Sequence, residues 1–136
     1  MVQATGFTTA YPASNVLVRD NDKFWLAKKE PNEGFTIKVD NCARMVAGCQ
    51  IKNMGKGASK NRATKEFRVS GSIHENGTWQ TLVEGQFADT SEKFASLLNF
   101  TFAEPVEVQY LKFELISYWG SIGGGLQYFA AIPATS

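Results

Sequence analysis

The sequence predicts an all-β protein, folded as a sandwich or jelly roll of two packed antiparallel sheets. Its 136 residues include ten Phe, four Tyr, three Trp and twelve Gly, a composition that favours strands and turns over helices. Several runs alternate apolar and polar residues with a period of two, as half-buried strands do. Gly, Pro, Asn and Asp separate these runs, which indicates turns between strands.

Alternation defines three of the strands, and Gly, Pro, Asn or Asp bounds four further candidates. Phe35, Ile37 and Val39 share one face of the first strand, with Thr36 and Lys38 opposite. The predicted strands cover residues 35–39, 47–53, 67–73, 79–87, 97–102, 108–116 and 126–132. We therefore expect seven or eight strands, enough for two sheets around one core.

Two local signals lie between these strands. Residues 74–77 end in an Asn-Gly pair, which readily adopts positive φ and predicts a tight hairpin. Residues 89–98 indicate a short helical turn, because Phe94, Leu97 and Leu98 have helical spacing after a capping residue. No repeat or linker interrupts the chain, so we expect a single domain over residues 1–136.

Charge and hydropathy exclude several classes of protein. Fourteen Lys and Arg balance thirteen Asp and Glu, so no global charge attracts nucleic acid or acidic membranes. No apolar stretch is long enough to span a bilayer, and the N-terminus has no signal-peptide pattern. We therefore expect a soluble chain with no signal peptide, while its native compartment stays open.

The sequence does not predict an enzyme. His74 is the single histidine and lies beside a predicted turn, without a nucleophile motif near it. We interpret it as a solvated turn residue. Asp20, Asp22, Glu30 and Glu33 lie in predicted loops, where no apolar setting raises a carboxyl pKa for general acid catalysis.

The two cysteines are Cys42 and Cys49, whose spacing fits neither a CxxC redox pair nor a zinc ligand set. A disulfide across this short loop is one interpretation. Two small buried thiols are the interpretation we favour, because Cys49 falls inside a predicted core strand.

Four segments carry a resemblance to a known family. Residues 14–25, 62–69, 77–79 and 108–113 resemble, in order, motifs of the discoidin family, also called the coagulation-factor type C family. The resemblance implies a galactose-binding-like jelly roll whose loops at one end bind a ligand without catalysis. Members recognise terminal sugars, phospholipid head groups, collagen or proteins, and the resemblance favours an extracellular location.

The resemblance also implies a calcium ion near the N-terminal loop, held by oxygen ligands. This chain departs from that pattern. Val18 and Arg19 replace an Asp and a Gly of the family motif, and Gln127 lies near the usual late Glu. Asp20 and Asp22 remain as candidate ligands, so we expect a weakened or absent calcium site.

Aromatic residues supply the first candidate ligand contacts. Trp119, with Tyr118 beside it, follows a core strand and precedes a run of three glycines over 123–125. An indole face suits the apolar C–H patch of a pyranose, which makes Trp119 the preferred stacking residue. The equally weighted alternative is that Trp119 plugs one end of the sandwich. Trp25 and Trp79 are expected to pack within the structure.

A basic loop supplies the second set. Arg62 offers a planar fork to sugar hydroxyls or an anion, Asn61 a donor and an acceptor, and Lys60 a further charge. Asn32 and Glu33 are candidates for the rim of the same site. A solvated basic loop is the alternative interpretation. These loops project few apolar side chains, which argues against membrane insertion.

The resulting hypothesis is a lectin-like module that binds a glycan or glycoprotein. Shallow polar sugar sites bind weakly, so useful binding favours an oligomer or several domains in one protein. The alternative is a protein-interaction or cell-adhesion module that uses the same loops. Phospholipid binding ranks below both, and nucleic acid is excluded because one basic loop without stacking aromatics is a poor footprint.

Overall fold

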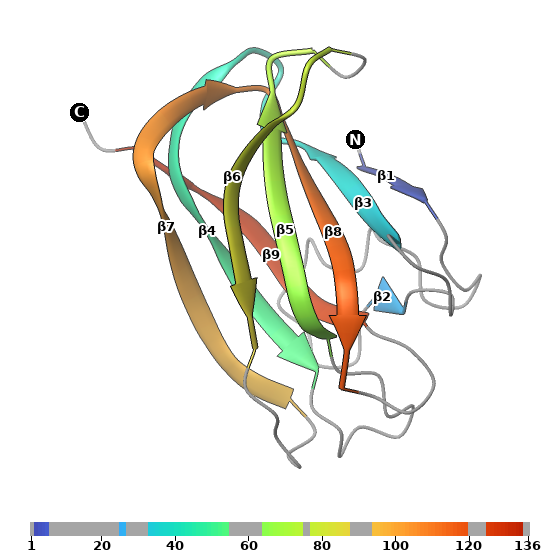
Figure 1. Cartoon of the computed structure of the whole chain (residues 1–136). Helices are drawn as coiled ribbons and strands as arrows, with labels where there is room; N and C mark the ends of the chain where they lie inside the picture. Colours follow the sequence, from blue (N-terminus) through green and yellow to red (C-terminus); the bar gives the residue numbers. More distant parts are fainter. Residues whose placement is uncertain are drawn as a thin grey trace.

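The computed structural model describes residues 2–5, 25–26, 33–54, 64–74, 77–87, 94–119 and 125–134. These residues form two antiparallel sheets that face one another as a sandwich (Figure 1). The all-β jelly-roll prediction is therefore confirmed. None of the described segments forms a helix with the length and apolar character that crossing a membrane requires.

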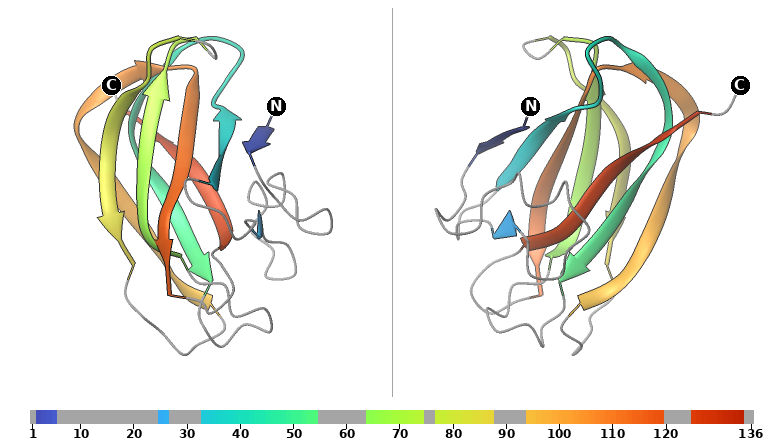
Figure 2. Two further views of the ribbon diagram at one scale, coloured as in Figure 1. Left: turned by 45° about the vertical axis from the view of Figure 1, so that its right-hand side comes forward. Right: turned by 180° about the vertical axis from the view of Figure 1, so that it is seen from behind.

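Nine strands build the sheets. They are β1 (Val2–Thr5), β2 (Trp25–Leu26), β3 (Glu33–Lys38), β4 (Arg44–Met54), β5 (Thr64–Ser72), β6 (Gln80–Gln86), β7 (Phe94–Val108), β8 (Tyr110–Tyr118) and β9 (Gly125–Pro133). One sheet has the order β1-β3-β8-β5-β6 and the other β2-β9-β4-β7. Because sequential strands often switch sheets, residues distant in the chain meet at both ends of the sandwich (Figure 2).

The core is built from the inward positions of the alternating strands. Phe35, Phe67, Phe113 and Phe129 are all buried, and Phe35 stacks on Phe113 with ring centroids 5.3 Å apart. Phe129 meets Phe113 edge-on from the opposite sheet at 5.9 Å. Aromatic pairs in these geometries add to the stabilisation from burying their area, so the rings tie the two sheets together.

Every strand predicted from the sequence is present, but the bounds differ. β1 and β2 were not predicted, because four- and two-residue strands are too short to show a period. β7 is longer than the predicted strand 97–102 and begins at Phe94. The helical turn predicted over residues 89–98 is therefore wrong for residues 94–98, which are extended. Pairing of Leu97 and Leu98 with β4 overrides the local helical preference.

Pro105 lies within β7, which forms one edge of its sheet. An edge strand tolerates proline because the missing N–H faces no neighbouring strand. The ladder between β4 and β7 also shifts register between Val46 and Gly48, near this proline. The proline and the bulge therefore explain why sequence alternation detected only the middle of β7.

The predicted hairpin between β5 and β6 is present. The Gly77 N–H donates to the His74 carbonyl at 3.1 Å, which closes a four-residue turn. The expected positive φ is not found at Gly77, and Asn76 lies outside the described residues. His74 is exposed, as expected of a turn residue.

The cysteines follow the prediction only in part. Both are free, and Cys49 is buried in β4, where burial raises its thiol pKa to about 12. Cys42 is exposed instead of buried, because it lies in the turn between β3 and β4 and not in a strand. A disulfide between them is absent.

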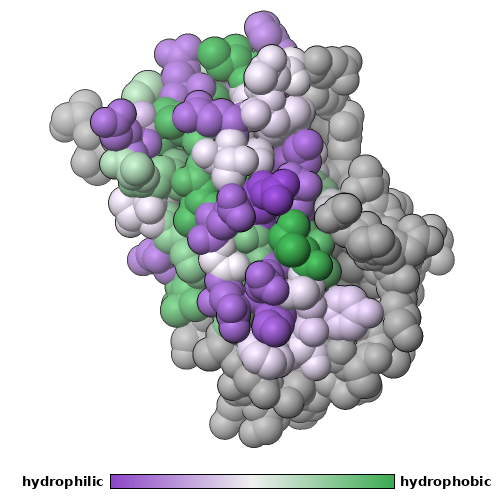
Figure 3. Space-filling model, in the orientation of Figure 1, coloured by the Kyte–Doolittle hydropathy of each residue, from purple (hydrophilic) through white to green (hydrophobic). Residues whose placement is uncertain are grey.

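The outer face of the five-stranded sheet is mainly hydrophilic where β5 and β8 run side by side (Figure 3). Arg68 of β5 faces Glu114 of β8, with Nη1 and Oε2 3.9 Å apart. Trp79, predicted to pack within the structure, is half-buried here, and the Lys112 ammonium lies 4.5 Å from its ring centroid. Trp79 therefore packs on the outer face and not in the core.

Candidate functional site

The topology brings the strand ends that flank every predicted ligand residue to one end of the sandwich. Thr64, at the start of β5, pairs with Tyr118 at the end of β8. Glu33, at the start of β3, pairs with Leu115 of β8. β4 ends and β9 begins at this same end (Figure 1). We call it the Trp119 end.

Trp119 is held by two residues from neighbouring strands. Its indole N–H donates to the Phe87 carbonyl at 2.9 Å, and the Lys65 ammonium lies 4.7 Å from its ring centroid. The Phe87 N–H in turn donates to the Lys65 carbonyl at 2.8 Å. Phe87 is buried and stacks on Phe67 at 4.7 Å, so this arrangement is anchored in the core.

The consequence is a half-buried indole with a fixed orientation. Because the Trp119 N–H is already bonded to Phe87, the indole has no donor left for a ligand. Contact with a ligand must therefore use the ring face or edge. A rigid aromatic platform loses little entropy on binding, which suits a stacking role.

Tyr118 and Ser117 occupy the adjoining positions. Tyr118 is half-buried and packs against the core. The Ser117 hydroxyl donates to the Glu66 carboxylate at 2.9 Å and accepts from the Glu66 N–H at 3.2 Å. These bonds fix the end of β8 against β5, directly before Trp119.

A buried polar cluster, not predicted from the sequence, lies at the base of the loops at this end. The Asn53 amide donates to the Thr64 carbonyl at 2.9 Å and accepts from its N–H at 3.2 Å. The Thr64 hydroxyl donates to the Gly125 carbonyl at 2.7 Å. We call these three residues the Asn53 clamp, since it joins β4, β5 and β9 across the two sheets.

The clamp has a signal in the sequence. Cys49, Ile51 and Asn53 occupy alternate positions of β4, and all three are buried. A polar residue that continues an inward apolar series must find partners inside the protein. The partners themselves are not predictable from local sequence, because Thr64 is eleven residues away and Gly125 is sixty-one residues beyond Thr64.

Several predicted residues lie outside the described part of the chain. These are Asp20, Asp22, Asn32, Lys60, Asn61 and Arg62, and for Glu33 only the backbone is described. The flanking positions Met54 and Thr64 place both ends of the segment 55–63 at the Trp119 end. The roles of these residues in ligand binding stay predictions.

The calcium prediction also stays open. Gln127, near the position where the family resemblance implies a Glu, is 1% exposed, and a neutral amide offers calcium an oxygen without a charge. Among the described residues, no three His, Cys, Asp or Glu side chains are grouped as metal ligands.

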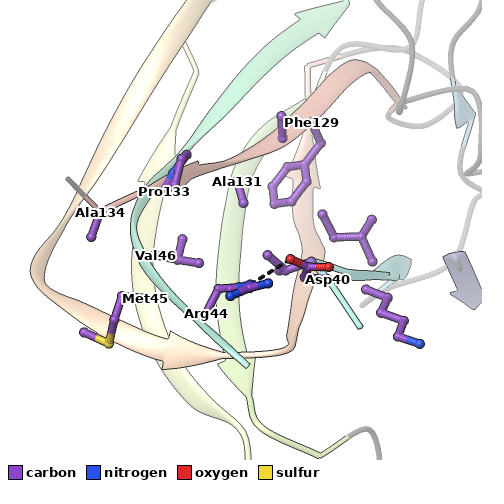
Figure 4. Close-up of a pocket in the computed structure, with 12 residues that line it drawn as sticks. Asp40, Arg44, Met45, Val46, Phe129, Ala131, Pro133 and Ala134 are labelled. Atoms are coloured by element: carbon purple, nitrogen blue, oxygen red, sulfur yellow. Dashed lines mark hydrogen bonds and ion pairs between the residues drawn. The ribbon is translucent and has the colours of Figure 1, made fainter. Parts of the chain in front are cut away.

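A groove of about 590 Å³ lies away from the Trp119 end, between β3, β4 and β9 (Figure 4). Val46, Phe129 and Ala131 contribute its apolar lining. Arg44 and Asp40 form an ion pair on it, with Nε and Oδ2 2.7 Å apart. The hydrogen bond from the Arg44 side chain lowers the pKa of the Asp40 carboxyl below its ordinary value.

The groove contains none of the predicted ligand residues. Lys38 of β3 pairs with Tyr110, at the start of β8, whereas Trp119 follows the end of that strand. The groove and Trp119 are therefore at opposite ends of β8. Lys38 also lines the groove, so the groove carries a positive charge beside the Asp40–Arg44 ion pair.

The fold and this loop-end arrangement define a jelly-roll domain of the ligand-binding type. The F5/8 type C domain model matches residues 2–127. The chain therefore belongs to the F5/8 type C, or discoidin, family, which confirms the resemblance found in the sequence.

Solved structures share this fold at low sequence identity. The family 32 carbohydrate-binding module of NanJ from Clostridium perfringens, in complex with galactose, is 16% identical with a TM-score of 0.77, covering 96% of this chain and 91% of that one. A pectin-binding module is 19% identical with a TM-score of 0.76, covering 100% and 91%. The family 32 module of AlyQ, in complex with 4,5-unsaturated mannuronic acid, is 15% identical with a TM-score of 0.77, covering 98% and 95%.

One curated relative is closer in sequence. SUN domain-containing protein 4 of Arabidopsis thaliana is 32% identical over 111 residues, which cover 80% of this chain. The match covers 17% of that relative, so the chain corresponds to a small part of its length.

Proposed function

We propose that this chain is a non-catalytic carbohydrate-binding module that holds its sugar at the Trp119 end. The observation that supports this most is the fixed indole, bonded to Phe87 at the end where the predicted loops begin and end. An indole that keeps its ring for contact matches the apolar face of a pyranose. The sugar-bound family 32 modules with the same fold make a glycan the first partner to test.

The remaining contacts in this proposal come from the predicted loop residues. Arg62, Asn61 and Lys60 would supply hydrogen bonds to sugar hydroxyls or to an anionic group, and Asn32 and Glu33 would line the rim. Such a site is shallow and polar, and its affinity per site is modest. Several copies in an oligomer or in one longer protein would raise the overall affinity.

The test is a glycan array with the purified protein, run with calcium and with a chelator. A Trp119→Ala variant is expected to lose at least about 2 kcal/mol of binding free energy, about thirtyfold in Kd, as expected for a central Trp contact. Trp79→Ala is the matched control, because Trp79 also has a lysine ammonium over its ring but lies on the outer face of the sheet. That variant is expected to bind as the unchanged protein does.

Either of two results would contradict the proposal. A folded protein that binds no glycan on the array removes the carbohydrate function. Equal losses in Trp119→Ala and Trp79→Ala would place the contact elsewhere or reduce the effect to stability, which circular dichroism and thermal unfolding of both variants would reveal.

A protein-interaction module is the second candidate, favoured by the groove between β3, β4 and β9. Its volume of about 590 Å³ and the exposed Met45 and Pro133 among its lining residues suit apolar side chains of a protein partner. Competition separates the two functions, because millimolar free sugar displaces a glycan ligand and leaves a protein partner bound. A Met45→Lys variant would place a charge on the groove at an exposed position and should reduce only protein binding.

A further inference from the structure

We propose that Lys65 selects sugars that carry an anionic group. Its ammonium covers a face of the Trp119 ring, and a neutral sugar that stacks there must displace the ammonium without forming an ion pair with it. This inference rests on the proposed function and names the class of sugar that the Trp119 end prefers. It is carried by the position of Lys65 Nζ, 4.7 Å from the Trp119 ring centroid.

The ammonium is held over the indole by a weak attraction. A cation–π contact at a partly exposed site changes an equilibrium constant by about two- to fivefold. Lys65 forms no ion pair with a carboxylate of the described residues, and the neighbouring carboxylate of Glu66 is engaged by the Ser117 hydroxyl. A ligand carboxylate or sulfate can therefore draw the ammonium away from the ring.

The charge of the surrounding chain points the same way. Residues 52–65 contain Lys52, Lys56, Lys60, Arg62 and Lys65 and no acidic residue. The net charge of the whole chain is +1, so this excess is local. Met54 and Thr64, the described residues that flank the segment 55–63, lie at the Trp119 end.

Selectivity follows from the difference between the two kinds of sugar. A neutral pyranose that stacks on the covered face must break the contact between the Lys65 ammonium and the Trp119 ring, and it offers the ammonium no anion in exchange. An acidic pyranose displaces the ammonium into an ion pair with its own anionic group. Discrimination is a difference of affinities, so a cost that only the neutral ligand bears is a source of specificity.

A backbone hydrogen bond holds the main chain of Lys65 in place beside Trp119. Its carbonyl accepts from the Phe87 N–H at 2.8 Å, and Phe87 also accepts from the Trp119 indole. Lys65 and Trp119 thus share one anchor. The side chain keeps its flexible stem, which allows the ammonium to move while the indole stays in place.

The experiment measures affinities for two matched pairs of sugars: trigalacturonate and its methyl ester, and a sulfated galactan oligosaccharide and its desulfated form. The unchanged protein is expected to bind one or both anionic members more tightly than their neutral partners, with a preference that weakens as salt is added. The pair that shows the preference identifies carboxylate or sulfate as the anion.

The Lys65→Gln variant should change the affinities for the anionic and the neutral sugar differently, whereas a merely structural role of Lys65 would change both in the same way. It should bind the anionic sugar about fivefold more weakly, the upper range for one exposed ion pair. Its affinity for the neutral sugar should be unchanged or rise by about two- to fivefold, because the ring face is uncovered. Lys65→Arg, which keeps the charge, should retain the preference.

Lys112→Gln is the matched control, since Lys112 lies 4.5 Å from the Trp79 ring centroid on the outer face of the sheet. It should leave the ratio of the two affinities unchanged. Equal binding of anionic and neutral partners by the unchanged protein, or an unaltered ratio in Lys65→Gln, overturns this inference while carbohydrate binding stands. Absence of binding to any sugar on the array overturns the proposed function itself.

Discussion

Replacing Asn53 by alanine removes the amide at the centre of the Asn53 clamp. Asn53 is 1% exposed and Thr64 is 0% exposed, so water does not replace the lost bonds. The Thr64 N–H and carbonyl would both lose the side-chain partner that they have now. A buried polar group left unsatisfied costs about 1–3 kcal/mol, so the variant should lose about 2–6 kcal/mol of unfolding free energy.

Urea unfolding followed by tryptophan fluorescence measures this loss. With a slope of about 2 kcal/mol per molar urea for a small domain, the midpoint should fall by about 1–3 M. Asn99→Ala is the control, because Asn99 is exposed on β7, and its effect should stay within about 0.5 kcal/mol. Equal midpoints for the two variants would refute the assigned role of the clamp.

Three further predictions concern residues away from the ligand. One equivalent of iodoacetamide at pH 8 should label Cys42 in the folded protein and leave Cys49 unmodified until urea is added, since Cys49 is buried with a pKa of about 12; labelling of both in the folded state contradicts this. Gly48→Ala should destabilise the protein by about 1–3 kcal/mol, because an added Cβ would collide with the Phe100 carbonyl of β7. Thermal unfolding measures this loss, and an unchanged melting temperature would contradict it by showing that β4 and β7 move apart to admit the methyl group. The Asp40 carboxyl should titrate by NMR with a pKa below that of an ordinary Asp, because Arg44 donates to it, and in Arg44→Gln its midpoint should rise. The stability from this pair is present above the unfolded pKa and is lost as the pH falls through the lowered one. An unmoved midpoint in the variant contradicts this.

The fold was predictable because burial imposes alternation on the central strands. Phe35 and Ile37 in β3, like Phe67 and Val69 in β5, are buried residues separated by one more exposed position. Edge strands give weaker signals. β7 contains Pro105 and a register shift in its ladder, so the alternation predicts only part of its length.

The candidate site was predictable to a smaller extent. Trp119 was selected because it follows a core strand and precedes a glycine run, and it does lie at the end of the sandwich where the loop-flanking strand ends meet. Its partner Lys65 comes from β5, and its partner Phe87 directly follows β6. Local sequence does not specify contacts between strands so far apart, and the position of Lys65 over the ring was therefore not foreseen.

The groove between β3, β4 and β9 was also not foreseen. Alternation assigned Ile37 to an inward position of its strand, and Ile37 is indeed buried. Ile37 nevertheless lines the groove, together with side chains from β4 and β9 of the other sheet. A pattern of inward residues predicts which side chains avoid water but not where the facing sheets leave a space.

The most direct test of carbohydrate binding at the Trp119 end is an NMR titration with the sugar that the array selects. The proposed site predicts shifts at the Trp119 indole N–H and at the Lys65, Thr64 and Gly125 amides, with no change at Ala131 in the groove. Shifts that gather around Ala131 while the Trp119 indole signal stays unchanged would contradict the proposed site.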